Sequence, residues 1–316
     1  MNHCGLYFSP DDVRAAQSQQ ARPPLKAAFE RLADHPVSGA ESLLRAGFLW
    51  RFLNNSQAGE GAILPLERAI GQPETDSSAP LIDRIGGLMT LAQAYELLRD
   101  HPAFEGSTHA HWREAFAEQV RAVNAESGQS GSLVDEIWTA LLNTAAGIVL
   151  DEPKRLQAVA GVFESVVRDE VRPQGHIARV VDQRGGSSIG RQILSASALV
   201  LIAEAAAHSG ENLDLWSYAV RGVSAATAAI YPIYYFYTTE KWKWDADLAP
   251  ETVQQWFRQH GGYLEIVYRR TGLKDVATVL EDLRPVFDAW GGGYTTISHG
   301  TGRTARDGRP RLSLFK

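Results

Sequence analysis

Helical periodicity dominates the pattern of apolar and polar positions along this chain. Residues 80–99 and 132–150 each repeat apolar side chains three or four positions apart, which is the spacing of one face of an α-helix. Ser9-Pro10-Asp11-Asp12 has the capping serine, early proline and first-turn acids of a helix start. The same criteria predict further helices at 23–34, 39–53, 107–125, 152–170, 190–208, 214–231, 250–260 and 275–289.

The evidence for strands is thin. Residues 263–268 are compatible with a strand or a short helix, and residues 294–297 indicate a short strand. The segment 54–79 is rich in glycine and proline and predicts a long loop or lid. The polar, basic segment 300–316 predicts a loosely held tail.

These elements predict an all-α protein that forms a single domain over residues 1–316. No short sequence repeat is visible, so a solenoid is not indicated. Two arrangements fit the helices. One is a helical toroid, in which outer helices surround inner ones, and the other is a helical bundle with irregular loops.

Composition and charge narrow the possible partners. The chain has 316 residues, 44% hydrophobic and 22% charged, and a formal net charge of -6, which is typical of a soluble globular protein. Nucleic acid is not expected as a partner, because its binding needs a dense basic surface. A local basic cleft for a polyanion is still compatible with this charge. No apolar run predicts a membrane span.

The cellular compartment stays open. Cys4 is the single cysteine, so no internal disulfide is expected. The first eight residues lack the charged and apolar regions of an export signal. We expect a cytoplasmic protein, or a periplasmic or secreted one if a signal peptide has been removed.

Metal and cofactor motifs are weak. His109 and His111 are two positions apart on a predicted helix, so their side chains point to different faces. Neither Gly185-Gly186 nor the triplet 291–293 matches a phosphate-binding or dinucleotide-binding pattern. We therefore predict no metal and no cofactor.

The most informative segment is the polar, glycine-rich stretch 173–191, which runs into a long apolar helix. It carries His176, Arg179, Arg184 and Arg191. Guanidinium groups on a loop attached to a rigid helix can bind an anion through paired hydrogen bonds. The segment therefore predicts an acidic ligand. Structural ion pairs, for example between Arg184 and a nearby aspartate, are the alternative.

Two further groups of residues are candidates for the same site. Asp135 and Glu136 lie beside Trp138, where a carboxylate could act as a general acid or base if burial raises its pKa. The alternative for Asp135 is a capping-box role at the start of the helix. Aromatic rings that could stack on sugars, or simply pack in the core, follow later in the chain. They are Tyr234, Tyr235, Tyr237, Trp242 and Trp244.

Four collinear segments carry a resemblance. They are 6–13, Leu-Tyr-Phe-Ser-Pro-Asp-Asp-Val; 81–99, with Leu-Ala-Gln-Ala-Tyr at its centre; 184–216, from Arg-Gly to Leu-Asp-Leu-Trp; and 234–244, a tyrosine-rich stretch ending in Lys-Trp. Each is similar to the corresponding part of the alginate lyase family, which is polysaccharide lyase family 5 and its relatives. The resemblance implies an (α/α) toroid of about eleven or twelve helices with long loops and a cleft. It also implies cleavage of 1,4-linked uronate chains by β-elimination.

The family's functional residues match only in part. Its Arg-Gly pair falls on Arg184-Gly185, but its catalytic tyrosine falls on Arg191. Its Asn-Asn-His triplet falls on residues 133–135, Leu-Val-Asp, and the tryptophan that follows is present as Trp138.

With these replacements, the resemblance assigns neutralisation of the uronate carboxylate to Arg184 and binding of a second acidic group to Arg191. His176 or a cleft tyrosine such as Tyr235 would move the proton, and Asp135 is the candidate carboxylate. Substrate contacts would come from Arg179, Glu136, Trp138, Tyr234, Tyr237, Trp242 and Trp244.

Three functions follow as hypotheses. The first is a polysaccharide lyase acting on an acidic poly- or oligosaccharide, whose unsaturated product absorbs in the ultraviolet. The second is a glycoside hydrolase on the same toroid, with Asp135 or Glu136 as the acid and a saturated product. The third is a carbohydrate-binding relative without turnover.

Overall fold

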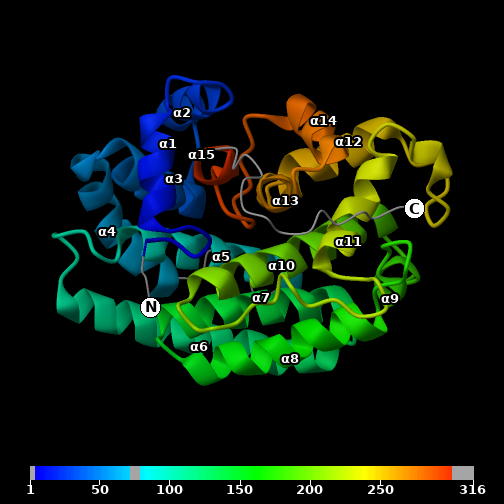
Figure 1. Ribbon diagram of the computed structural model, residues 1–316. Coiled ribbons are helices and arrows are strands. Elements are labelled where there is room, and N and C mark those ends of the chain that lie inside the picture. Colours follow the sequence, from blue (N-terminus) through cyan, green and yellow to red (C-terminus); the bar gives the residue numbers. More distant parts are fainter. Residues whose placement is uncertain (1–3, 72–78, 301–316) are drawn as a thin grey trace.

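The computed structural model describes residues 4–71 and 79–300 (Figure 1). These residues form fifteen α-helices, two short 3-10 helices and three isolated β-bridges. The helices are α1 (Pro10–Ser18), α2 (Leu25–Asp34), α3 (Gly39–Leu53), α4 (Ser56–Gly71), α5 (Leu81–Leu98), α6 (Gly106–Ser130), α7 (Leu133–Val149), α8 (Pro153–Asp169), α9 (Ala178–Val181), α10 (Ser188–His208), α11 (Ala225–Ile230), η1 (Tyr231–Tyr235), η2 (Thr239–Lys241), α12 (Pro250–His260), α13 (Tyr263–Thr271), α14 (Lys274–Leu283) and α15 (Thr295–His299).

The helices form an inner and an outer layer. Helices α5, α7 and α10 are buried on nearly every side, whereas α6 and α8 bury only one apolar stripe each. Helix α7 packs against α6 and α8 on one side and against α5 and α10 on the other, and Figure 1 shows α6 and α8 along the outside. The predicted all-α class is therefore confirmed.

The first and last helices meet and close the ring. Figure 1 shows α1 and α2 beside α15, and three interactions join these ends. Asp12 forms an ion pair with Arg269, and the His299 ring nitrogen Nε2 lies 3.1 Å from the Tyr7 carbonyl oxygen. Arg31 donates a hydrogen bond to the carbonyl of Pro285. These contacts bring the N-terminal helices to the C-terminal turn.

One cluster of buried apolar side chains extends from Cys4 to Ile297. Helix α10 is long and apolar enough to cross a membrane, but 94% of its most apolar stretch is buried inside the protein. Its apolar composition therefore serves the core of the ring.

Most predicted helices are present within a few residues of their expected bounds. The helix start at Ser9 is confirmed, since its backbone amide donates to the Asp12 carboxylate at 2.8 Å and its hydroxyl accepts from the Asp12 amide. Residues 263–268, left open between strand and helix, lie in α13.

The predicted loop or lid at 54–79 is wrong for its described part. Residues 56–71 form α4, which includes Pro65. Burial of Ala62, Ile63 and Leu66 stabilises the helix despite the missing backbone donor of the proline. Glycine at position 59 is explained by close packing, because a Cβ there would lie 2.8 Å from the His101 ring. Residues 72–78 of this prediction and 301–316 of the predicted tail lie outside the described residues.

Three other predictions need correction. The helix predicted at 214–231 is reduced to α11, because the capping box of Ser224 and Thr227 starts it later. Helix α14 ends at Leu283 rather than 289, because Pro285 disfavours helical geometry in the residue before it. The strand predicted at 294–297 is instead the start of α15.

Candidate functional site

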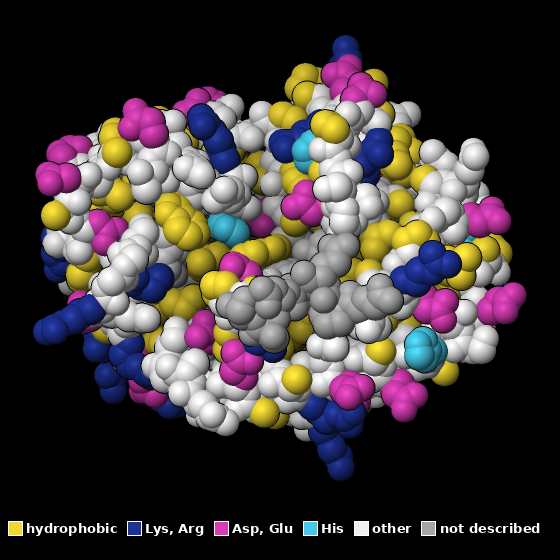
Figure 2. All heavy atoms as spheres, turned by 180° about the vertical axis from the view of Figure 1, so that it is seen from behind, with side chains coloured by type: hydrophobic (Ala, Val, Ile, Leu, Met, Phe, Trp, Pro, Cys, Tyr) yellow, Lys and Arg dark blue, Asp and Glu magenta, His cyan; other side chains and the backbone are white. Residues whose placement is uncertain are grey.

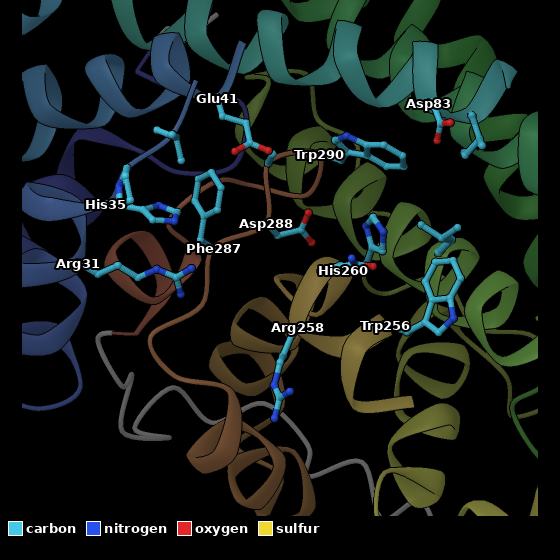
Figure 3. Close-up of a pocket in the computed structure, with 16 residues that line it drawn as sticks. Arg31, His35, Glu41, Asp83, Trp256, Arg258, His260, Phe287, Asp288 and Trp290 are labelled. Carbon is cyan, nitrogen blue, oxygen red and sulfur yellow. The ribbon is translucent and has the colours of Figure 1, made fainter. Parts of the chain in front are cut away.

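A cavity of about 620 Å³ lies between the two ends of the chain and the inner helices (Figure 3). Its walls come from the end of α2 and the start of α3, the start of α5, Leu194 of α10, the end of α12, and the turn 287–290. Its polar or aromatic lining residues are Arg31, His35, Glu41, Asp83, Trp256, Arg258, Gln259, His260, Phe287, Asp288 and Trp290.

One side of the cavity combines a cation with an oriented imidazole. The His35 ring nitrogen Nδ1 lies 3.1 Å from the Tyr294 hydroxyl oxygen, so the two groups share a hydrogen bond. The edge of the His35 ring packs on Phe287, with 4.8 Å between centroids, and the Arg31 guanidinium lies 5.8 Å from the same ring. Arg31 and His35 therefore flank Phe287 on one wall (Figure 3).

Burial and neighbouring cations favour the uncharged form of this imidazole. Burial lowers the pKa of His35, and the guanidinium groups of Arg31 and Arg45 lower it further. Burial raises the pKa of Tyr294 to about 12, so its hydroxyl stays protonated. With a proton on Nδ1, His35 donates to Tyr294 and keeps a lone pair on Nε2.

The opposite side of the cavity is aromatic. His260 lies between Trp256 and Trp290, with ring centroids 5.6 Å and 5.0 Å away (Figure 3). Its buried Nδ1 has no hydrogen-bond partner in the described part of the chain, and burial lowers the pKa of His260 to about 4. This wall therefore presents a neutral imidazole between two rings.

Two glycines on inner helices make room for these tryptophans. A Cβ on Gly86 of α5 would lie 2.1 Å from the Trp290 ring, and a Cβ on Gly190 of α10 would lie 2.3 Å from the Trp256 ring. Both rings thus lie directly on the backbone of an inner helix. Any larger residue at either glycine would push a cavity wall inward.

The turn that carries Phe287 and Trp290 is built around Asp288. This buried carboxylate accepts hydrogen bonds from the amides of Gly262 at 3.2 Å and Gly291 at 2.8 Å. Burial raises the pKa of Asp288 to about 7, although the backbone amides favour the ionised form. Both of its oxygens accept hydrogen bonds from backbone amides, so the main role of Asp288 is to stabilise the turn that forms this cavity wall.

Side chains of helix α5 form hydrogen bonds with the same turn. The Gln93 side chain donates to the Ala289 carbonyl at 3.0 Å and accepts from the Gly292 amide at 2.9 Å. Thr90 donates to the Ala289 carbonyl at 3.1 Å. These polar residues of a buried helix position a wall almost two hundred residues away in sequence.

None of the site residues predicted from the sequence is among those that line this cavity. Arg191 bonds instead to its own loop, through the carbonyls of Val180 at 3.0 Å, Gln183 at 2.6 Å and Gly185. This guanidinium shapes the loop 180–186.

Arg179 of α9 and Arg184 of the loop are both exposed. An Arg179 nitrogen lies 3.5 Å from the Glu170 carboxylate. Arg184 is exposed and has no hydrogen bond or ion pair with another described residue. The roles of both stay predictions.

The structure does bring His176 together with predicted aromatic residues. The His176 ring lies 4.9 Å from Trp244 and 5.7 Å from Tyr231. Trp242 lies 4.8 Å from both Trp244 and Tyr235. These five rings form one cluster beside the start of α10, while Tyr234 and Tyr237 remain exposed nearby.

The predicted acidic pair lies at the start of α7. The Asp135 amide donates to the Ser132 hydroxyl at 3.4 Å, as a helix cap requires, and burial raises the pKa of Asp135. Glu136 is exposed. Trp138 is buried and supports the cavity from behind, because it donates to the Leu194 carbonyl at 3.1 Å and its ring lies 5.7 Å from Trp290.

The cavity residues were missed because they come from five distant segments. A local signal existed for some of them. Trp256 and His260 are one helical turn apart, and Thr90 and Gln93, which hold the turn that forms one wall, are polar positions within an apolar stretch of a helix. Nothing local connects these to Arg31 and His35. No group of three or more potential metal ligands occurs among residues 4–71 and 79–300.

Comparison with known proteins agrees with the fold. A model of the family described as "Alginate lyase" matches residues 60–242, more than half of the chain. No curated protein matches this sequence. A histidine-to-alanine variant of alginate lyase A1-III complexed with tetrasaccharide is 15% identical, with a TM-score of 0.74 over 94% of this chain and 95% of that one.

Other solved structures give a similar result. A tyrosine-to-phenylalanine variant of alginate lyase A1-III, also with tetrasaccharide, has a TM-score of 0.65 at 15% identity over 89% of this chain and 81% of that one. An alginate lyase from Bacteroides ovatus has a TM-score of 0.69 at 11% identity over 95% and 99%. The predicted helical toroid is thereby confirmed.

Proposed function

This chain belongs to the alginate lyase family, and we propose that it is a polysaccharide lyase that cleaves a uronate-containing polysaccharide by β-elimination. Membership of this family supports β-elimination as the reaction class. The cavity supports a place for the reaction, because it lies inside the toroid and holds both cations and proton-transfer groups.

One observation carries the assignment of residues. His35 lines the cavity beside Arg31 and is held by a 3.1 Å hydrogen bond to the buried Tyr294. A base that is itself oriented by a third group is the usual arrangement for proton abstraction. Arg31 is placed on the same wall, where it can neutralise the carboxylate whose neighbouring C–H must become acidic.

The chemical step then follows. Arg31 binds the C5 carboxylate of the uronate, and Nε2 of His35 removes the proton from C5. The C4–O bond breaks as the C4=C5 double bond forms, and the oxygen leaves with the adjoining sugar. The protonated His35 returns its proton to that oxygen, so the imidazole ends the cycle neutral.

A screen of polysaccharides tests the function. The protein is incubated with alginate, polyglucuronate, pectate and unsulfated glycosaminoglycans, while ultraviolet absorbance and reducing ends are measured together. A lyase produces both signals in parallel. Reducing ends without absorbance would indicate hydrolysis, and binding without either signal would indicate a carbohydrate-binding relative; both results contradict the proposal.

Variants of His35 and Tyr294 test the assigned base. His35→Ala should reduce kcat by about 100-fold or more, since a positioned proton-transfer group is removed. Tyr294→Phe should reduce kcat with little change in KM, because the imidazole loses its orienting partner. Tyr7→Phe is the matched control, since the buried Tyr7 hydroxyl has no hydrogen-bond partner in the described residues.

Arginine variants separate the cavity from the loop predicted by the sequence. Arg31→Ala should abolish turnover, whereas Arg184→Ala should retain it. Loss of activity in Arg184→Ala at an unchanged melting temperature would instead place the neutralising cation on the loop, and the assignment of Arg31 would fail.

A further inference from the structure

The charges along the cavity are mixed. In the described part of the chain its lining has two arginines, Arg31 and Arg258, and two acidic side chains, Glu41 and Asp83, while the carboxyl group of Asp288 is engaged by backbone amides. Lys, Arg, Asp and Glu side chains are also interspersed on the face shown in Figure 2. A chain made only of uronic acids brings one carboxylate per sugar, and like charges at short range are repelled. Such a lining is poorly suited to several consecutive carboxylates.

The charged groups are also unevenly placed. Figure 3 shows Arg31, His35 and Glu41 on one side of the cavity and Trp256, His260, Trp290 and Asp83 on the other, while the side chain of Arg258 extends away from the aromatic rings. The second side therefore has a carboxylate at its edge. A sugar carboxylate bound there would face Asp83 and would have the neutral His260 as its neighbour.

The aromatic wall suits an uncharged sugar. Trp256 and Trp290 lie on the backbone of inner helices at Gly190 and Gly86, so both rings have fixed positions. Rings of this kind pack on the C–H faces of sugars. His260 lines the cavity between these rings, and a neutral imidazole can donate a hydrogen bond to, or accept one from, a hydroxyl or acetamido group.

We propose that the substrate of this cavity alternates a uronic acid with an uncharged sugar, with the acid bound at Arg31 and the uncharged sugar against Trp256, His260 and Trp290. The proposal rests on the lyase function and specifies its substrate class.

The experiment compares two classes of 4-linked uronate. Hyaluronan and unsulfated heparosan supply uronate alternating with N-acetylglucosamine, and alginate and polyglucuronate supply uronate alone. Initial rates of ultraviolet absorbance should give a kcat/KM at least about tenfold higher for the alternating class. Equal or higher kcat/KM for the homopolymers would overturn the substrate assignment and leave the lyase function intact. No unsaturated product from either class would overturn the lyase function, and the substrate assignment with it.

Charge reversal at Asp83 provides an internal test. Asp83 is exposed, so Asp83→Lys should fold normally and should shift the kcat/KM ratio toward the homopolymers. Glu118→Lys makes a charge reversal on the exposed face of α6 and is the matched control, for which the ratio should not change. An unchanged ratio in Asp83→Lys would contradict the charge argument.

Variants of His260 test the proposed hydrogen bond. His260→Phe should raise KM for the alternating class more than it lowers kcat, and His260→Gln should recover part of the loss. A structural role for His260 would instead lower the melting temperature and affect both substrate classes equally.

Discussion

At the scale of single residues, the site depends on how burial and neighbouring charge set the state of each histidine. His35 and His260 both have a lowered pKa, but only His35 is beside cations and has a hydrogen-bond partner. The sequence identifies both as histidines on predicted helices or their ends. Their difference is tertiary, because Tyr294 is 259 residues away from His35 in the chain.

The pH dependence of turnover should report the environment of His35. The titratable and charged groups around its ring are Arg31, Arg45 and Tyr294, and Glu41 acts in turn on Tyr294. Since the neutral form is the base and its pKa is lowered, the acidic limb of kcat/KM should lie below the usual imidazole pKa of about 6.5. Arg45→Gln removes one cation, so the pKa should rise and the limb should move to higher pH. A limb that moves to lower pH would exclude His35 as the base.

At the scale of elements, inner helices act as platforms for loops that carry the site. Apolar periodicity predicted α5 and α10, and their high apolar content fits an inner position. Gly86 and Gly190 have no evident role in that pattern. Their role is steric and is visible only when Trp290 and Trp256 pack on them.

Alanine substitution should distinguish these glycines from ordinary helical ones. Gly86→Ala places a Cβ against the Trp290 ring, so we expect a loss of about 1–3 kcal/mol in the free energy of unfolding and a lower kcat/KM. In Gly161→Ala on α8 the new Cβ meets no atom within 4 Å, and the higher helix propensity of alanine should raise stability by about 0.5–1 kcal/mol. Chemical denaturation measures both. If both substitutions changed the free energy of unfolding equally, the contact with Trp290 would not limit the size of the side chain at position 86.

At the scale of the whole molecule, contacts between distant ends close the ring and form the cavity between them. Arg269 of α13 pairs with Asp12 of α1, and both side chains are largely buried. The pKa of Asp12 is lowered from 3.8 to about 2, since the ion pair with Arg269 and the bonds from Ser9 outweigh burial. Protonation of Asp12 in acid should therefore weaken this contact between the two ends.

Acid should weaken the wild type through this pair. A lowered carboxyl pKa stabilises the folded state above pH 4 or so, and this contribution is lost as the pH falls toward 2. Asp12→Asn should reduce the free energy of unfolding by about 2 kcal/mol at pH 7, and the difference from wild type should shrink at low pH. Asp11→Asn in an exposed pair with Arg14 should have a smaller effect. A pH-independent difference for Asp12→Asn would argue that capping of α1 is its main role.

The sequence by itself determined the all-α class, most helix positions and the family, because apolar spacing and capping are local and collinear resemblance survives low identity. The prediction from local composition was wrong at α4, where glycines and a proline indicated a loop but close packing stabilises a helix. The tertiary structure alone decided the candidate site. It joins residues 31–41, 82–83, 194, 256–260 and 287–290 through contacts such as those of His35 with Phe287 and of His260 with Trp290. No local pattern encodes which distant segments will share one cavity.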